Sequence, residues 1–492
     1  MQCHLETTSH PLPNEIRKYD RGPFSYRPGE PLGAFMLFYD HAPGRGRDDK
    51  FEIVSSVYRL RKSQCFLQSN GALTCITCHN PHDIPHGPAA ADRYDAACRQ
   101  CHSVIHADNH PQAGSCIGCH MPKRRTEDAV RVVMTDHLIE RRPAANLLAE
   151  FPEGDAKESD YLGEVVPYGG ADLGADDLYT AVAQVAEKTN LDAGIPRLEA
   201  AIAQRQPADA VFYLQMGDAY CSTNQFGKAV GVYQQAVARR PNSSVALRRL
   251  AYAFLGSGQL PQALDVLLHA TRSEPSDAEA WYDLGLIQSE LGKPTDALES
   301  LRKAIELDPE YADAQARLGA ILAQSGQTGL AEAAFRSALR IQPTLAIAHA
   351  NLANLLASRS DLAEGAWHFA RAGGKAIDQF HYGVTLARMN RLAEAQTHIE
   401  AALKADPSLA EAHDVLGGLL EKQGRLDAAL VQYRDAVRIR PDLGGAHFDL
   451  GRVLAKRHDL AAAAEEFRKA AVDPDPAMRQ QALQALQAIG AR

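Results

Sequence analysis

Apolar and small residues recur with a long, regular period through the second two-thirds of the chain. In each unit, an apolar segment that contains one small residue is followed by a second apolar segment and a closing proline. The small residue recurs every 34 residues, at Gly217, Ala251, Gly285 and Gly319. This pattern predicts two amphipathic helices per unit, with the small residue where the helices approach each other and the proline ending the second helix.

Seven units are complete, and they occupy residues 210–243, 244–277, 278–311, 312–345, 376–409, 410–443 and 444–475. A shortened unit at 346–375 lacks the closing proline, and a degenerate unit occupies about 176–209. Residues 477–489 predict an amphipathic capping helix, which a stack of repeats needs to cover its last apolar face. We therefore expect a mostly α fold, with an all-α solenoid of eight or nine repeats over residues 176–492.

The cysteine-rich region (residues 1–140) has a different composition. It is rich in Pro and Gly, shows no long apolar period, and contains eight of the nine cysteines of the chain. A stretch this irregular rarely builds a core from side chains alone, so its Cys and His residues indicate a metal or a cofactor. We expect an irregular cofactor domain here, followed by a linker at residues 141–175.

Three segments have the sequence Cys-x-x-Cys-His, the pattern that attaches c-type haem. They are Cys75–Cys78–His79, Cys98–Cys101–His102 and Cys116–Cys119–His120. Two thiols at this spacing reach the two vinyl groups of a haem, and the adjacent histidine lies beneath the iron as its proximal ligand. Paired Cys-x-x-Cys motifs also bind zinc, but a zinc site has no need of a histidine after every pair. A redox-active dithiol is disfavoured because no βαβ pattern surrounds the motifs.

The first residues, Met1-Gln2-Cys3-His4, match the end of a fourth motif. They predict Cys3 as a haem thioether and His4 as a proximal ligand, with the missing cysteine immediately before Met1. Haem of the c type is attached outside the cytoplasm, and no signal peptide is visible in the chain. We therefore expect the natural protein to begin upstream with an export signal and to be periplasmic or otherwise extracytoplasmic.

The remaining histidines of the cysteine-rich region are candidates for the distal iron ligands. They include His82, His110, His137, His41, His106 and His10. Because His82 follows His79 by only three residues, it cannot easily reach the other face of the same iron, whereas it can bind a neighbouring haem. The supply is large enough to give every haem two histidine ligands, which leaves no open position at iron.

These motifs, with Asn80-Pro81-His82 after the first and Met121-Pro122 after the third, resemble the multihaem c-type cytochromes with doubled Cys-x-x-Cys-His motifs. That group includes the tetrahaem cytochrome c family of periplasmic electron carriers. The resemblance implies haem c groups that carry single electrons and a distal-ligand role for His82. The cut first motif departs from the family and leaves the number of haems at three or four. The repeats resemble the tetratricopeptide repeat (TPR), which implies a protein-binding solenoid without catalytic residues.

Together these features predict an extracytoplasmic multihaem electron-transfer protein, rather than an enzyme, whose solenoid docks a redox partner. Two alternatives stay open: a multihaem reductase of small nitrogen oxides with one open haem site, and a zinc-binding intracellular TPR scaffold. The 61 acidic residues outnumber the 52 basic ones, which disfavours nucleic acid as a partner. No apolar run approaches the roughly 18 residues of a transmembrane helix.

Partner contacts are expected on the first helices of the repeats, from side chains outside the packing pattern. Aromatic and arginine side chains are enriched where binding energy concentrates. The candidates are Arg248, Tyr252, Tyr282, Phe380, Phe448 and Arg452. Packing between repeats is an equally good interpretation of the aromatic ones.

Overall fold

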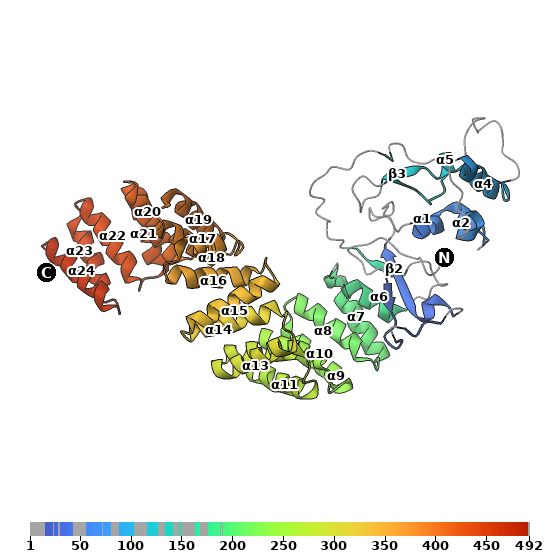
Figure 1. Ribbon diagram of the computed structural model, residues 1–492, viewed down its shortest axis with the longest axis horizontal. Coiled ribbons are helices and arrows are strands. Elements are labelled where there is room, and N and C mark those ends of the chain that lie inside the picture. The colour runs from blue at the N-terminus through green and yellow to red at the C-terminus, as the bar shows by residue number, and fades with distance from the viewer. Residues whose placement is uncertain are drawn as a thin grey trace. The chain divides into compact units, whose positions relative to one another are not determined.

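The structure is a computed structural model of the 492-residue chain (Figure 1). It describes residues 15–22, 24–27, 30–42, 56–70, 72–79, 88–102, 116–125, 133–140, 147–148, 163–167, 176–186, 188 and 190–490. The chain divides into two compact units, one ending at Ser273 and the other beginning at Glu274. Helices dominate the described residues of both units, which confirms a mostly α fold.

A small antiparallel sheet begins the first unit. In order across the sheet, its strands are β1 (Glu15–Arg17), β2 (Met36–His41) and β5 (Val165–Pro167). A short 3-10 turn, η2 (Leu32–Ala34), leads into β2. The neighbouring residues Leu37 and Phe38 point to opposite faces of the sheet and are 1% and 3% exposed, so both faces are covered. Strand β5 lies in the segment expected to be a linker, and the end of that segment is therefore part of the sheet.

The sheet is fixed to the first repeat helix, α6 (Asp177–Ala186). The side chain of Gln184 accepts a hydrogen bond from the backbone N–H of Val165 (2.7 Å). The hydroxyl of Tyr179 accepts one from the backbone N–H of Tyr19 (2.7 Å). Because the sheet covers α6 on one side and the next helices cover it on the other, nearly every residue of α6 is buried. The sheet thus caps the N-terminal end of the repeats.

The repeats form antiparallel helix pairs in both units (Figure 1). In the first unit the further helices are α7 (Leu191–Arg205), α8 (Ala210–Ser222), α9 (Phe226–Arg239), α10 (Ser244–Gly256) and α11 (Leu260–Ser273). In the second unit they are α12 (Ala278–Glu290), α13 (Pro294–Leu307), α14 (Ala312–Gln324), α15 (Thr328–Ile341), α16 (Ala346–Ser358), α17 (Leu362–Phe369), α18 (Ala376–Arg388), α19 (Leu392–Ala405), α20 (Ala410–Lys422), α21 (Leu426–Ile439), α22 (Gly444–Lys456), α23 (Leu460–Ala470) and α24 (Pro476–Ala488). Each predicted repeat contains one helix pair, and α24 packs on α22 and α23.

Each pair closes around a small residue on its first helix and a large side chain sixteen positions later on its second. A Cβ added to Gly285 would lie 2.8 Å from Cγ of Leu301, and one added to Gly319 would lie 2.7 Å from the ring of Phe335. The same relation joins Gly217 to Tyr233, Gly383 to Ile399, Gly417 to Tyr433 and Gly451 to Phe467. The periodic small residue is therefore the position at which the two helix backbones come close.

Beyond β1, η2 and β2, the described part of the cysteine-rich region contains short helices and one hairpin. The helices are α1 (Ser56–Lys62), α2 (Gln64–Gln68), α3 (Cys75–Cys78), α4 (Pro88–Arg99) and α5 (Cys116–His120), and the hairpin pairs β3 (Lys123–Arg125) with β4 (Val133–Thr135). Helix α4 contacts both α3 and α5. Across the whole described chain, no helix is long and apolar enough to cross a membrane.

Candidate functional site

Each Cys-x-x-Cys-His motif adopts a helical turn. In the first motif the backbone N–H of His79 donates to the carbonyl of Cys75 (2.8 Å). In the second, the N–H of His102 donates to the carbonyl of Cys98 (3.0 Å), and the third motif forms the whole of α5. Residues three and four positions apart share one face of a helical turn. The two cysteines and the histidine of a motif therefore share one face and can bind the same ligand.

Cys98 of the second motif lies near one cysteine of each of the other two motifs. Burial, and then the neighbouring thiols of Cys116 and Cys78, raise the pKa of Cys98 to about 11. Burial followed by the thiol of Cys101 also raises the pKa of Cys65. Helices α3, α4 and α5 therefore gather the three motifs into one cluster. Among the described residues, no group of three or more Cys, His, Asp or Glu side chains is arranged to hold a metal ion.

Two of the predicted iron ligands have one ring nitrogen held by a backbone carbonyl. Nδ1 of His120 lies 2.8 Å from the carbonyl oxygen of Glu140, and Nδ1 of His137 lies 3.0 Å from that of Thr135. A carbonyl oxygen can only accept, so Nδ1 donates in both cases and, in the neutral ring, Nε2 carries the lone pair. Metal-binding histidines are commonly oriented in this way. Burial also lowers the pKa of His137, which favours the neutral ring.

The ring of His137 lies beside the first Cys-x-x-Cys-His motif. Its centroid lies 6.2 Å from that of His79, with 36° between the two ring planes. The ring of Tyr94, on α4, lies edge-on to His79 with a centroid separation of 5.4 Å. The structure therefore places a predicted proximal ligand beside a predicted distal one.

A buried ion pair holds the residue next to His137. Nε and Nη2 of Arg59, on α1, donate to the two carboxylate oxygens of Asp136 at 2.8 and 2.6 Å. Arg59 is 1% exposed and Asp136 is 3% exposed. The backbone N–H of Leu138 also donates to Asp136, at 2.9 Å. A bidentate contact of this kind fixes both the position and the orientation of a carboxylate. Sequence analysis did not identify Arg59, because no motif connects it to a partner 77 positions away.

The other predicted haem-binding residues fall into two groups. His41 lies on β2, is 5% exposed, and has its Nδ1 3.7 Å from the carboxylate of Asp40. His102 is exposed, in the turn that follows α4. Cys3, His4, His10, His82, His106 and His110 lie outside the described residues, as does the side chain of Cys119.

The aromatic candidates on the repeat helices differ in exposure. Tyr252 is 57% exposed, and its ring lies 6.1 Å from that of Phe226. The ring of Tyr282 packs on Tyr311 at 4.9 Å. Phe380 and Phe448 pack against the apolar core of the second unit. Tyr252 is therefore available to a partner, whereas Phe380 and Phe448 serve packing between the repeats.

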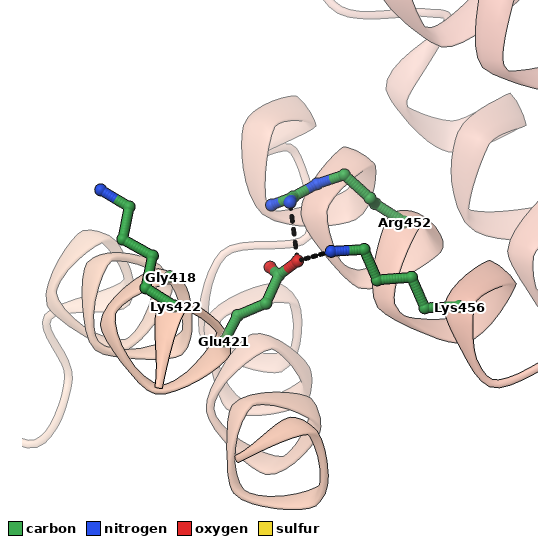
Figure 2. A pocket seen from close by; sticks show the side chains of 5 residues that line it. All are labelled: Gly418, Glu421, Lys422, Arg452 and Lys456. Carbon is green, nitrogen blue, oxygen red and sulfur yellow. Dashed lines mark hydrogen bonds and ion pairs between the residues drawn. The ribbon is translucent and has the colours of Figure 1, made fainter. Parts of the chain in front are cut away.

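Of the arginine candidates, Arg248 lies half-buried on α10, and Arg452 lines a pocket on the first helices of two successive repeats. This charged pocket, with a volume of about 270 Å³, is lined by Gly418, Glu421, Lys422, Arg452 and Lys456. Figure 2 shows Arg452 and Lys456 reaching from α22 toward Glu421 on α20, while Lys422 extends away from it. The Glu421 carboxylate, whose side chain is 7% exposed, accepts from Arg452 at 2.7 Å and from Lys456 at 2.5 Å.

Two more acidic groups adjoin the charged pocket. Asp414 lies one helical turn before Gly418 on α20, and burial followed by the charge of Asp449 raises the pKa of Asp414 to about 7. Asp449 accepts two hydrogen bonds from Arg452, and burial raises its pKa. The hydroxyl of Tyr433 donates to Glu421 at 3.2 Å. The pocket thus combines largely buried acidic groups with partly exposed cationic side chains on the repeat helices.

Comparisons with known proteins identify the repeats. A model of the C-terminal domain of cilia and flagella-associated protein 70 matches residues 170–387, and a tetratricopeptide-repeat model matches residues 383–444. Neither match reaches the cysteine-rich region. No curated protein matches the chain.

Several solved structures are similar to parts of this chain. The chain is similar to the APC/C hetero-tetramer Cut9–Hcn1, with 16% identity over 58% of this chain and 56% of that chain and a TM-score of 0.44. It is also similar to pilF of Pseudomonas aeruginosa, with 22% identity over 43% of this chain and 99% of that chain and a TM-score of 0.39. A third similar structure is YrrB, a TPR protein with an unusual peptide-binding site. It has 23% identity over 39% of this chain and 99% of that chain and a TM-score of 0.34.

The helix pairs and the matching family models together define the class. The chain carries an α-helical solenoid of tetratricopeptide repeats, which is a protein-interaction domain.

Proposed function

We propose that this chain is a multihaem electron-transfer protein whose TPR domain docks a redox partner. The observation that carries the proposal is the convergence of three complete Cys-x-x-Cys-His motifs in one cluster of helical turns. The tautomers of His120 and His137 support it, because both rings keep Nε2 for a metal. The bidentate Arg59–Asp136 pair adds a rigid support of the kind that a ligand histidine requires.

The residues present fit c-type haem in number and kind. The cysteines of the three motifs would attach the haems, and Cys3 would be half of a fourth motif. The proximal iron ligands would be His79, His102, His120 and His4. Haem c, when bound, supplies reversible one-electron exchange between ferrous and ferric iron. Groups of this chain would hold and orient it: the backbone carbonyls of Glu140 and Thr135 fix the tautomers of His120 and His137, and two histidines per iron would exclude other ligands. Thioether attachment outside the cytoplasm places the protein in the periplasm or another extracytoplasmic space.

Haem content tests this proposal directly. We would express the full chain behind an export signal in cells with a cytochrome c maturation system, and measure covalent haem by the pyridine haemochrome assay and intact mass. One haem per complete motif is expected. The double variant C75A/C78A should lose one haem, whereas the control C65A, which removes a cysteine outside the motifs, should lose none. A protein without haem that binds stoichiometric zinc would refute the proposal in favour of a zinc-bearing scaffold.

The charged pocket supports a docking role for the TPR domain. Its lining contains three cationic side chains and one carboxylate, Glu421. Arg452 and Lys456 both bind this carboxylate, so they are already arranged around an anionic group. A partner that presents an acidic side chain or a terminal carboxylate would meet the same two donors. The proposed redox partner therefore carries an acidic docking segment.

A further inference from the structure

His79 and His137 lie at the right separation to bind one metal ion between them. Their ring centroids are 6.2 Å apart. An imidazole nitrogen binds a metal at about 2 Å, so two rings on opposite sides of one metal have their centroids about 6 Å apart. We propose that His79 and His137 are the two axial ligands of the haem attached at Cys75 and Cys78. The inference rests on the proposed function, since it requires haem at that motif.

His137 is prepared for this role by its own hydrogen bonds. Its Nδ1 donates to the carbonyl of Thr135, at the end of β4, so Nε2 is the nitrogen that remains to bind iron. His41, the other described histidine of the region outside the motifs, lies instead within the sheet beside Asp40. In the part of the chain that the structure describes, His137 is thus the ligand candidate that faces a motif histidine.

The backbone on either side of His137 is fixed from three directions. Arg59 holds the Asp136 carboxylate from α1. The backbone N–H of Asp136 donates to the carbonyl of Pro122 at 2.9 Å, which ties this segment to the residues after the third motif. The side chain of Asp136 in turn accepts from the backbone N–H of Leu138. Arg59 and Asp136 are therefore positioning residues for the ligand at 137.

The same segment also supports the third motif. The backbone N–H of Glu140 donates to the carbonyl of His120 at 3.1 Å, and the carbonyl of Glu140 accepts from Nδ1 of His120 at 2.8 Å. Residues 135–140 therefore supply a ligand to the first motif and orient the proximal histidine of the third. Haems bound at these two motifs would therefore be neighbours, close enough for direct electron exchange.

Replacement of His137 tests the assignment in the full, haem-loaded protein. H137A should keep the wild-type haem count but convert one haem from low-spin to high-spin, seen by electron paramagnetic resonance and optical spectra. The reduced variant should bind one carbon monoxide that the wild type does not, and added imidazole should restore the low-spin spectrum. The matched control is H413A, which removes a similarly half-buried histidine from the repeat helix α20 and should leave the spectra unchanged.

Several results would overturn the assignment. If H137A remains fully low-spin and binds no carbon monoxide, His137 is not a ligand, even though haem is present and the proposed function stands. A wild-type chain that carries no haem refutes both proposals together. If H137A folds poorly, H137M gives a second measurement, because a thioether ligand keeps the iron low-spin and raises its reduction potential. An unchanged potential in H137M would count against the assignment.

The positioning role of Arg59 has its own readout. R59M removes the guanidinium group that holds Asp136. The variant should give a mixture of high-spin and low-spin iron at one haem, with the haem count unchanged. R59K, which keeps one donor, should recover most of the low-spin signal. A purely structural role would lower stability in R59M without changing the spin state.

Discussion

Asp414 provides a quantitative test of the charged pocket. Its carboxyl is held on α20 next to Asp449 and Arg452, and its Oδ1 is buried without a hydrogen-bond partner among the described residues. Burial, and then the charge of Asp449, raise the pKa of Asp414 from 3.8 to about 7. The folded protein therefore prefers the neutral carboxyl, and we expect D414N, which is neutral at every pH, to stabilise this region above pH 7.

The sign and size of this stability change follow from the pKa values of Asp414 in the unfolded and the folded protein. Between about pH 4 and pH 7 the folded state binds more protons than the unfolded state, so stability falls as the pH rises through this range. A shift of about three units corresponds to about 4 kcal/mol at most. Because Asp414 keeps some contact with water, screening reduces the expected effect to about 2 kcal/mol. The free energy of unfolding of D414N minus that of the wild type should therefore be about 2 kcal/mol larger at pH 8 than at pH 4.

Hydrogen exchange is the suitable assay, because a chain with two compact units is not expected to unfold in one step. Peptides from α20 and α22 of the wild type and D414N would be compared at equal pH, at pH 4 and at pH 8. The control D427N removes the same charge from an exposed side chain and should show no comparable gain at pH 8. If D414N exchanges faster than the wild type at pH 8, the folded protein uses the ionised carboxylate to pair with Arg452. That result would refute our argument that burial dominates.

Three further predictions concern packing, the ligand support and docking. G285A should cost about 1–3 kcal/mol because its Cβ would lie 2.8 Å from a leucine side chain, whereas G231A, with open space around it, should be neutral or stabilising, as measured by hydrogen exchange of the helix that carries each glycine. R59M should cost up to about 3 kcal/mol, because the buried Asp136 loses its bidentate partner and keeps only Arg124 at 3.8 Å and the backbone N–H of Leu138. The double variant R59M/D136L should recover most of this loss when hydrogen exchange of β4 is measured. E421Q should bind a labelled glutamate-rich peptide more tightly by fluorescence anisotropy, because it frees Lys456 and one nitrogen of Arg452, whose other nitrogens stay bound to Asp449; weaker binding would contradict the acidic-partner assignment.

The repeats could be predicted from the sequence because their information is local and repeated. A small residue on one helix and a large one sixteen positions later lie within a single unit, as in Gly319 and Phe335, and the same pair recurs along the chain. The shortened repeat was visible for the same reason, since it keeps Ala353 and Phe369 in the same relation. Period and spacing therefore define where each helix pair begins and ends.

The sheet and the ligand support could not be predicted, because they depend on distant residues. Strand β5 has three residues and pairs with β2 more than 120 positions earlier, so neither strand carries a period that indicates the other. Arg59 and Asp136 are likewise joined only by the fold. For Phe380 and Phe448, the sequence pattern was equally consistent with packing and with partner binding. The structure shows that both side chains pack against the core formed by neighbouring helices.

Helix α1 links the ligand support to the repeats within the first unit. Arg59 holds the segment that carries His137, and one turn later Lys62 lies 3.4 Å from the carboxylate of Asp40 on β2. Strand β2 pairs with β5, whose first residue is hydrogen-bonded to Gln184 of α6. A continuous series of buried or half-buried contacts thus connects the proposed iron ligand to the first repeat helix. Ligand geometry at a metal requires rigid supporting elements, and here the capped end of the solenoid provides them. The fusion of the small, irregular cysteine-rich region to a long solenoid therefore has a structural reason as well as the proposed docking one, because the repeats provide a framework that supports this region.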